Sequence, residues 1–385
     1  METYGKNSSD IKRNNRGRVL QMVATGRCKT RQELVSSMGL TKMSISNIVA
    51  EFQEKNILVE SGKKMGKGVG RRSVSLDISD KAPKVIGLLI VRDRVEAVLC
   101  DFRLHILHRM EKKLFKPSER ELIDLMFTLV DSMLSFDDNV IGIGVSSLGP
   151  VNPETGIIME PPYFYNIRNL QVSKLLETRY SLPVRIYQDN QSGALEEYLY
   201  GNGRGHENLM LLGLERGVGC GIIKDGSVFI GNLNLSPEIG HVSIDFKGRK
   251  CVCGNCGCLE MYVNSEEMKN RLEKAAKTEG TLEELYTMEE TPEMTEVFND
   301  MLERLSAGLS STINLMNLDL VLLGYDGVLL PEKYVNRLER RLNERLFYSG
   351  SMRVDVKKPF YGRDAQLLGG ACNILAAIYD GEIAI

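Results

Sequence analysis

The sequence predicts an α/β protein of two lobes, preceded by a small winged helix-turn-helix domain. Strand-like apolar runs recur at 85–90, 95–100, 140–145, 184–186, 209–212 and 320–323, and helical patterns alternate with them at 118–134, 170–180 and 292–316. The β-rich segments that begin at Val85 and Leu209 indicate two α/β lobes that face a cleft. Short capped helices followed by a basic loop predict the N-terminal domain. We expect the winged helix over residues 1–78, a linker over 79–84 and the two-lobed body over 85–385.

The N-terminal domain is predicted from its helix caps and its turns. A helical apolar pattern over 13–26 ends at Gly26, and Thr30 and Glu33 have the spacing of a capping box for the next helix. Thr41 is a second capping residue and starts a third helix. Two alternating runs, at 57–60 and 73–76, enclose a loop rich in Gly and Lys, which predicts a β-hairpin. This hairpin is the wing.

The charge of the chain is unevenly distributed. Residues 1–80 hold fifteen Lys and Arg against eight Asp and Glu, although the whole chain has a formal net charge of −2. A basic domain on an acidic body is typical of a nucleic-acid-binding module joined to another function. A winged helix used for protein contacts is the alternative. For DNA, we expect the third helix to enter the major groove through Thr41, Lys42, Ser44, Ser46 and Asn47, and the wing to hold phosphates through Lys63, Lys64, Lys67, Arg71 and Arg72.

The composition indicates a cytoplasmic protein without a membrane segment. The N-terminal residues include no apolar run of the kind found in signal peptides, and no stretch approaches eighteen consecutive apolar residues. The chain has eight cysteines, of which four fall within eight residues. Such crowding favours metal binding in a reducing compartment over a disulfide framework.

The cysteine cluster is the most specific chemical signal. Thiolate and imidazole are the ligands that zinc prefers in a tetrahedral site, and glycines between the cysteines allow the backbone to fold back so that the sulfurs converge. A cluster of reduced cysteines in a surface loop, or a redox Cys-x-x-Cys pair, is the alternative. The residues concerned are His241, Cys251, Cys253, Cys256 and Cys258.

The chain resembles the ROK family of repressors, unclassified reading frames and sugar kinases. The resemblance is carried by the segment from Glu238 to His241, by the Cys-x-Cys-Gly-x-x-Gly-Cys-x-Glu pattern at 251–260 and by the winged helix ending at 70–72. It is strongest to the repressor branch, near the xylose repressors. The resemblance implies the two-lobed, actin-like fold of sugar kinases, assembled as a dimer or tetramer.

The resemblance also implies the residues of two sites. A structural zinc ion would be bound by His241, Cys251, Cys253 and Cys258, whereas Cys256 departs from the family pattern and leaves an all-cysteine set open. A sugar would be bound by Asp189, Glu238, His241 and Glu260, with His241 serving metal and sugar through different faces of its ring. The alternative is that these groups only support the metal.

The phosphate-binding segments of the family's kinases have changed in this chain. In the first loop Leu89 replaces the magnesium-side carboxylate and Arg92 replaces a glycine, and in the second Glu215 places a negative charge where phosphate would bind. The adenosine-side glycine run reads Gly324-Tyr325-Asp326-Gly327. We therefore expect no kinase activity and no catalytic residue.

The predicted function is a sugar-responsive transcriptional repressor of carbohydrate-utilisation genes that leaves an inverted-repeat DNA operator when the sugar binds. One alternative is a carbohydrate kinase that retains Asp189 as general base. Another is a regulator controlled by a protein partner, which the aromatic loop at Tyr163 to Tyr165 allows because it reads as exposed. The surrounding segment, 161–166, replaces a loop with which members of the resembled family contact the sugar. Residues 277–300 read as a variable surface segment.

Overall fold

The computed structural model describes residues 8–61, 74–347, 350 and 352–385. The chain forms two compact units. The first comprises Met1–Leu148, Thr155–Tyr187 and Gly370–Ile385, and the second comprises Gly149–Glu154 and Gln188–Gly369. Each unit has one five-stranded sheet. The predicted α/β class is therefore confirmed, whereas the exact domain borders remain a prediction.

The N-terminal domain has the predicted helix-turn-helix and hairpin. Helices α1 (Ser8–Ala24), α2 (Arg31–Met38) and α3 (Lys42–Glu54) precede an antiparallel pair of strands, β1 (Leu58–Ser61) and β2 (Ser75–Ile78). Thr30 caps α2 by accepting a hydrogen bond from the backbone N–H of Glu33. The Glu33 side chain accepts instead from the backbone N–H of Lys29, so the reciprocal half of the predicted capping box is wrong by one residue. The domain core consists of Val19, Leu20, Leu34, Ile45, Val49 and Phe52, all fully buried.

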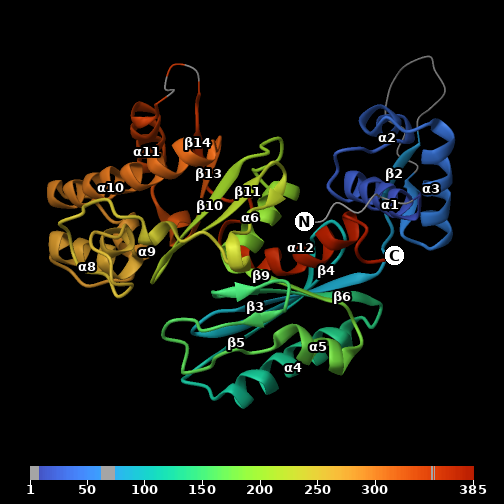
Figure 1. The fold of residues 1–385 in the computed structure, drawn as a ribbon, viewed down its shortest axis with the longest axis horizontal. Helices are drawn as coiled ribbons and strands as arrows, with labels where there is room; N and C mark the ends of the chain where they lie inside the picture. The colour runs from blue at the N-terminus through green and yellow to red at the C-terminus, as the bar shows by residue number, and fades with distance from the viewer. Residues whose placement is uncertain (1–7, 62–73, 348–349, 351) are drawn as a thin grey trace. The chain divides into compact units, whose positions relative to one another are not determined.

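The first sheet has the strand order β5-β4-β3-β6-β9. Its strands are β3 (Lys84–Ile90), β4 (Arg94–Cys100), β5 (Ile106–Lys113), β6 (Val140–Ser147) and β9 (Val184–Gln188). Helices α4 (Glu119–Phe136) and α5 (Val172–Tyr180) lie on one face, and α12 (Ala365–Tyr379) lies on the other (Figure 1). Every residue of β3 is buried, as expected for a strand covered on both faces.

Helix α12 approaches the first sheet backbone to backbone. A Cβ atom on Gly144 would lie 1.8 Å from the carbonyl oxygen of Gly370, and a Cβ on Gly87 would lie 2.7 Å from the amide nitrogen of Ala371. Glycines at these strand positions are therefore required by packing rather than by backbone conformation. Residues 365–369 of α12 belong to the second unit and residues 370–379 to the first, so one continuous helix belongs to both.

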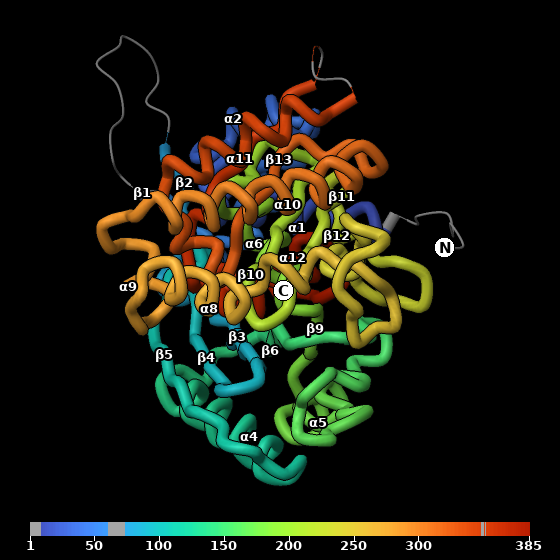
Figure 2. The backbone as a smooth tube through the Cα atoms, turned by 90° about the vertical axis from the view of Figure 1, so that its left-hand side faces the viewer, coloured from blue at the N-terminus to red at the C-terminus, as the bar shows by residue number. Residues whose placement is uncertain are grey.

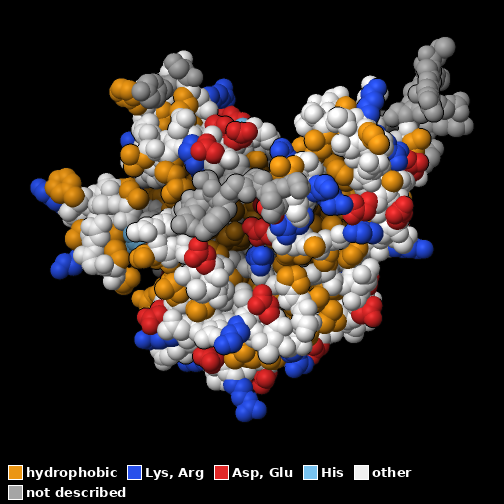
Figure 3. Space-filling view, turned by 45° about the vertical axis from the view of Figure 1, so that its right-hand side comes forward, with side chains coloured by type: hydrophobic (Ala, Val, Ile, Leu, Met, Phe, Trp, Pro, Cys, Tyr) orange, Lys and Arg blue, Asp and Glu red, His pale blue; other side chains and the backbone are white. Residues whose placement is uncertain are grey.

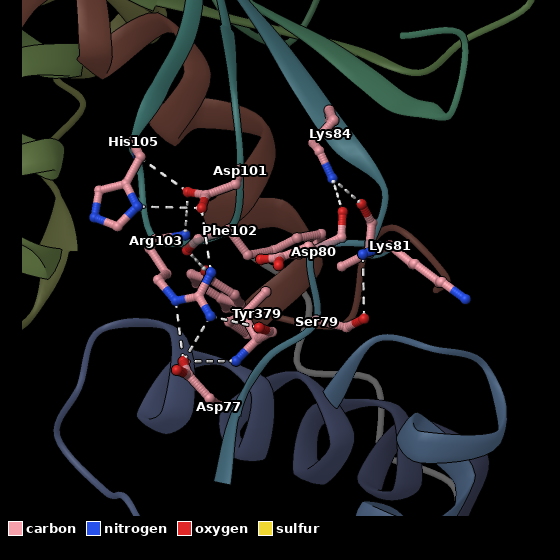
Figure 4. A network of polar contacts seen from close by, with 12 residues as sticks. Asp77, Ser79, Asp80, Lys81, Lys84, Asp101, Phe102, Arg103, His105 and Tyr379 are labelled. Atoms are coloured by element: carbon pink, nitrogen blue, oxygen red, sulfur yellow. Dashed lines mark hydrogen bonds and ion pairs between the residues drawn. The ribbon is translucent and has the colours of Figure 1, made fainter. Parts of the chain in front are cut away.

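The N-terminal domain packs on the C-terminal end of α12. A Cβ on Gly17 of α1 would lie 2.1 Å from the carbonyl oxygen of Tyr379. From the turn between β4 and β5, the Arg103 guanidinium donates a 3.0 Å hydrogen bond to Asp77 Oδ1 and a further one to the carbonyl oxygen of Ile78 (Figure 4). The domain is thus held by helix packing and by a polar contact at the end of β2.

The predicted linker is itself ordered by hydrogen bonds. Ser79 and Ala82 are buried, and the Lys84 ammonium donates to the carbonyl oxygens of Asp80 and Ala82 at 2.8 and 2.6 Å (Figure 4). A segment whose backbone groups are satisfied in this way behaves as a stiff connection.

The second sheet has the order β12-β11-β10-β13-β14. Its strands are β10 (Leu209–Leu214), β11 (Val218–Lys224), β12 (Ser227–Val228), β13 (Leu320–Tyr325) and β14 (Asp355–Lys357). Helix α6 (Asp189–Leu199) packs on β10 and β11, and a helical layer is formed by α7 (Glu260–Val263), α8 (Ser265–Ala276), α9 (Leu282–Thr287), α10 (Pro292–Met316) and α11 (Glu332–Arg345). Figure 2 shows α8 and α10 next to one another.

The reading of residues 277–300 as a surface segment is wrong. Leu285, Tyr286, Met294 and Phe298 are buried there, and the Phe298 ring stacks on that of Tyr334 with centroids 4.3 Å apart. Most Glu residues of this segment are exposed, and they obscure an apolar stripe of helical period in the sequence. Short elements complete the structure: β7 (Val151–Asn152), β8 (Ile157–Ile158), and the 3-10 turns η1 (Asn232–Asn234), η2 (Ile239–His241), η3 (Asp326–Leu329) and η4 (Gly362–Asp364). Among the described residues, no helix combines the length and apolarity that crossing a bilayer requires.

Two adjacent carboxyls are buried in the C-terminal half of α6. Glu196 and Glu197 are both fully shielded from solvent. Glu197 accepts hydrogen bonds from the backbone N–H groups of Asn202 and Phe360, at 2.7 and 2.6 Å. Burial and the neighbouring charge of Glu197 raise the pKa of Glu196 well above its ordinary value. Glu196 is therefore protonated in the folded protein at pH values where it would ionise in the unfolded chain.

Replacing Gly17 with leucine is expected to separate α1 from α12, because the new side chain has no space beside the carbonyl of Tyr379. We expect a loss of about 1–3 kcal/mol of packing free energy and faster tryptic cleavage at the exposed Lys81. Limited proteolysis followed by mass spectrometry measures the cleavage. Arg18→Ala, at an exposed neighbour on the same helix, is the control, and cleavage at equal rates in both variants would contradict the packing role.

The buried Glu196 predicts a fall in stability as pH rises. Its contribution is complete below the unfolded-state pKa, near 4.5, and is lost as pH rises from there through the raised folded-state pKa, because the folded protein resists losing the proton. Urea unfolding at a series of pH values measures this slope. Glu196→Gln is expected to flatten it, and the exposed Glu344→Gln to leave it as in the wild type. Equal slopes in all three proteins would show that Glu196 is ionised in the fold.

Candidate functional site

The N-terminal end of α3 has a polar face that is open to solvent. Lys42, Ser46 and Asn47 are exposed there. Thr41 Oγ1 accepts from the backbone N–H of Ser44 at 3.1 Å, and the two hydroxyl oxygens lie 3.0 Å apart. Lys42, Ser46 and Asn47 are thus exposed and take no part in the cap, whereas Thr41 and Ser44 hold the start of the helix. Their contact with DNA remains a prediction.

Met43 also belongs to this face, and the sequence analysis overlooked it. Its side chain is 74% exposed, beside Lys42. An exposed apolar group there can contact a thymine methyl in the major groove. The signal was a lone methionine on an otherwise polar helix face. The predicted wing contacts Arg71 and Arg72, and the wing lysines, lie outside the described residues. On the face shown in Figure 3, basic and acidic side chains are interspersed.

The four predicted metal ligands converge in the second unit. The ligand atoms of His241, Cys251, Cys253 and Cys258 all lie within 4.8 Å of one another. Cys253 Sγ lies 3.6 Å from Cys258 Sγ, and Cys251 Sγ lies 3.6 Å from His241 Nδ1. A tetrahedron with metal–sulfur bonds of about 2.3 Å has edges of about 3.8 Å. The spacing therefore fits a tetrahedral metal ion with these four ligands.

The backbone of the cysteine segment folds back on residues 242–245. Leu259 donates its backbone N–H to the carbonyl of Val242, and Ile244 donates to the carbonyl of Gly257. Gly257 has φ 69°, and a Cβ there would lie 1.8 Å from the carbonyl oxygen of Asp245, so only glycine fits. Cys256 is not a member of the converging group.

His241 faces the cluster with one ring nitrogen. Its Nδ1 lies near Cys251 Sγ and 3.5 Å from Glu260 Oε1. Nε2 is on the other side of the imidazole ring and is left for another partner. This geometry suits the dual role expected of His241. Glu260 is the first residue of α7 and lies two positions after Cys258, the last cysteine of the cluster. The turn that holds the cluster therefore also places Glu260 beside the imidazole.

Asp189 is the first residue of α6 and is 8% exposed. Its Oδ1 accepts a 2.7 Å hydrogen bond from the backbone N–H of Asn190, and its Oδ2 accepts a 2.5 Å hydrogen bond from the hydroxyl of Tyr325. The sequence analysis treated Tyr325 only as a lost glycine. Its backbone at φ 52° and its hydroxyl contact make it part of the site.

Glu238 joins the same group of acids. Glu238 is exposed, yet the surrounding protein and the charges of Glu260 and Asp189 raise the pKa of its carboxyl, while His241 opposes the shift. Glu238 therefore lies within electrostatic range of the other three residues. A group of hydrogen-bond acceptors around one imidazole suits a ligand with several hydroxyls.

Packing, rather than phosphate binding, explains glycines in the hairpin formed by β10 and β11. A Cβ on Gly221 would lie 2.0 Å from the carbonyl oxygen of Asn190, and a Cβ on Gly213 would lie 2.3 Å from Asn190 Oδ1. The N-terminal turn of α6 packs directly against this hairpin. At its tip Glu215 donates its backbone N–H to the carbonyl of Gly217, forming a tight turn. These glycines therefore carry no evidence of nucleotide binding.

The corresponding first segment is a tight hairpin between β3 and β4. Leu89 is 2% exposed within β3, so no carboxylate is available there for magnesium. Arg92 donates from Nε to the carbonyl of Pro162 at 3.3 Å, and its own carbonyl accepts from the hydroxyl of Tyr165 at 2.9 Å. The aromatic segment is only partly exposed: Phe164 is buried, in contrast to the expected open loop, while Tyr163 is 78% exposed.

Named relatives include several repressors. The chain is 24% identical over 375 residues to a xylose repressor of Caldicellulosiruptor bescii, covering 91% of this chain and 93% of that protein. It is 28% identical over 271 residues to a xylose repressor of Bacillus spizizenii, covering 69% and 70% of the two chains. It is 26% identical over 262 residues to the DNA-binding transcriptional repressor Mlc of Escherichia coli, covering 67% and 64%.

Solved structures share the fold. A ROK family transcriptional regulator described as a homologue of the E. coli Mlc protein superimposes with a TM-score of 0.79 at 23% identity, covering 97% of this chain and 98% of that one. A ROK family glucokinase from Streptomyces griseus superimposes with a TM-score of 0.66 at 21% identity, covering 75% and 98%. The two-lobed α/β body is thus common to regulators and kinases, and the pattern of the ROK family matches residues 85–376, so this chain belongs to the ROK family.

Proposed function

We propose that the protein is a sugar-responsive, DNA-binding transcriptional repressor with a structural zinc ion. The observation that carries this proposal is the combination, in one chain, of a helix-turn-helix with a hairpin and a group of acidic residues near His241. The repressors among its relatives support the same function. Binding DNA agrees with a cytoplasmic location, in which all eight cysteines are reduced.

The effector is an uncharged sugar in this proposal. Asp189, Glu238 and Glu260 present three carboxyl groups, and Glu215 adds a fourth acid at the tip of the β10–β11 hairpin. Carboxylates accept hydrogen bonds from hydroxyls but repel a phosphate. Xylose, glucose and N-acetylglucosamine are the first sugars to examine, because relatives and a structural neighbour are named for them.

The zinc ion has a structural role in this proposal. Four protein ligands close a tetrahedral site and leave no position for a reactive water. The ion would hold the segment around Cys251 and Cys258 together and thereby fix His241 and Glu260 in the proposed sugar site. The segment has little core of its own, since Phe246 and Val252 are 81% and 78% exposed.

Helix α12 is the proposed connection between sugar and DNA. Its first turn belongs to the second unit, which contains the acceptors, and its last residue contacts Gly17 of the winged helix. In a homodimer on an inverted repeat, two recognition helices must match half-sites about 34–36 Å apart. A small movement of each α12 then changes DNA affinity, provided that the sugar favours one of the two states.

A kinase and a partner-controlled regulator are the remaining alternatives. Asp189 would serve a kinase as general base, and the exposed ring of Tyr163 would serve a protein interface. ATP turnover with the three sugars separates the first from the proposal. Affinity capture with and without sugar separates the second.

Cys258→Ser is expected to lose bound zinc and to lower the melting temperature, since it removes a buried ligand of the cluster. Cys256→Ser, at the neighbouring cysteine outside the cluster, is expected to keep about one ion per chain. Elemental analysis of the purified proteins measures the ion, and thermal denaturation measures the stability. Loss of zinc from both variants would assign Cys256 to the site and favour the all-cysteine set.

The full-length protein is expected to bind its own upstream DNA and to release it when one of the three sugars is added. Fluorescence anisotropy at a fixed salt concentration measures both, because the affinity depends steeply on salt. Asp189→Ala is expected to bind the DNA as the wild type does but to ignore the sugar. Glu344→Ala, which removes an exposed carboxylate of α11, is the control.

Release by glucose 6-phosphate rather than by any neutral sugar would contradict the uncharged effector. Tight DNA binding that no sugar alters would contradict sugar sensing and favour a protein partner.

A further inference from the structure

Tyr325 reaches from the end of β13 to the acid at the start of α6. Its hydroxyl donates to Asp189 Oδ2 at 2.5 Å, and the backbone N–H of Asn190 donates to Oδ1 at 2.7 Å. Both oxygens of Asp189 therefore already accept a hydrogen bond from the chain itself. Because Asp189 is 8% exposed, a ligand hydroxyl has little unoccupied carboxylate to approach.

The backbone of Tyr325 is strained. Its φ of 52° and ψ of −126° lie in a region that glycine adopts easily and other residues avoid. Strained residues persist only where the surroundings hold them, and they gather at binding sites and switches. The short hydrogen bond to a carboxylate is one such restraint, since bonds to a charged acceptor are stronger than neutral ones.

A tyrosine hydroxyl and a sugar hydroxyl offer a carboxylate the same chemical group. Each donates one O–H, so each can occupy the same acceptor position on Asp189. We propose that Tyr325 is an internal competitor of the effector: its hydroxyl occupies, in the free protein, the position on Asp189 Oδ2 that a monosaccharide hydroxyl takes in the complex. This inference rests on the proposed function, because it requires Asp189 to be a sugar ligand.

Displacement of Tyr325 would shift the residues at the start of α12. Tyr325 is followed directly by η3, whose Asp326 lies 3.7 Å from the guanidinium of Arg363 in η4. Arg363 also lies 3.7 Å from Glu283 of α9. Helix α12 begins at Ala365, two residues after Arg363. When the hydroxyl contact breaks, the strained backbone of Tyr325 can relax. The resulting movement would pass through η3 and η4 to α12, the helix that ends at the winged domain.

The test is calorimetric titration of the full-length protein with D-xylose, D-glucose and N-acetyl-D-glucosamine, each added separately. Tyr325→Phe keeps the ring and removes the hydroxyl. We expect it to bind the effector about 10-fold more tightly than the wild type, because no hydrogen bond to a charged group must first be broken. Tyr325→Gly also removes the strain and is expected to bind more tightly too, which protects the test against misfolding of one variant.

The matched control is Tyr180→Phe. Tyr180 donates its hydroxyl to Asp131 Oδ1 at 2.7 Å, so the change removes the same kind of bond from the first unit and is expected to leave sugar affinity unchanged. If both Tyr325 variants bind sugar no more tightly than the wild type, while Asp189→Ala loses binding, the competitor role is wrong and the proposed function stands. If the wild type and both Tyr325 variants bind none of the three sugars, the proposed function and the competitor role both fail.

Discussion

The rest of the structure depends on the contact of α12 with the first sheet. Because Gly87, Gly144 and Gly370 have no side chains, the helix and the strands meet at backbone distance. Close-packed surfaces of this kind do not deform continuously, since any shift creates overlap or loses contact. Residues 370–379 of the helix are therefore held firmly against the strands of the first unit. The last of them, Tyr379, places its carbonyl against Gly17 of the winged helix.

The cysteine segment combines scarce apolar packing with a group of side chains that could hold a metal ion. Residues 245–257 expose Phe246 and Val252 and contain several glycines, so they bury little apolar surface. Hydrogen bonds such as that from Ile244 to Gly257 set its path, but exposed turns of this length gain little from hydrogen bonds alone. A metal ion bound by His241 and the three cysteines would supply the missing restraint, since binding to such a site contributes directly to folding. It would also fix His241 and, through it, the neighbouring Glu260.

The sequence predicted most of this fold because its local signals are strong. The helix at Pro292–Met316 was predicted at both ends, since Thr291 caps it and Asn317 ends it in the left-handed conformation. The cysteine spacing indicated a metal cluster, and the resemblance to the ROK family indicated which four residues converge. Other features were not predictable because they depend on contacts between residues far apart in the chain. The local sequence does not indicate that Gly221 packs against the backbone of Asn190 or that Leu285 is buried among acidic neighbours. Nor does it indicate that the Tyr325 hydroxyl contacts Asp189, 136 positions earlier in the chain.

A repressor and a kinase make different demands on the same acidic residue. A kinase must activate the sugar hydroxyl and hold a phosphoryl donor in line with it. A sensor needs only that the sugar bind one conformation more tightly than another, and the shift it produces is limited by that difference in affinity. Tyr325 meets the second demand without the first. It gives Asp189 a partner in the free state, so that sugar binding becomes an exchange between two arrangements of the chain. A strained tyrosine at position 325 that can exchange its place on Asp189 with a sugar hydroxyl would thus supply the second arrangement that a sensor requires.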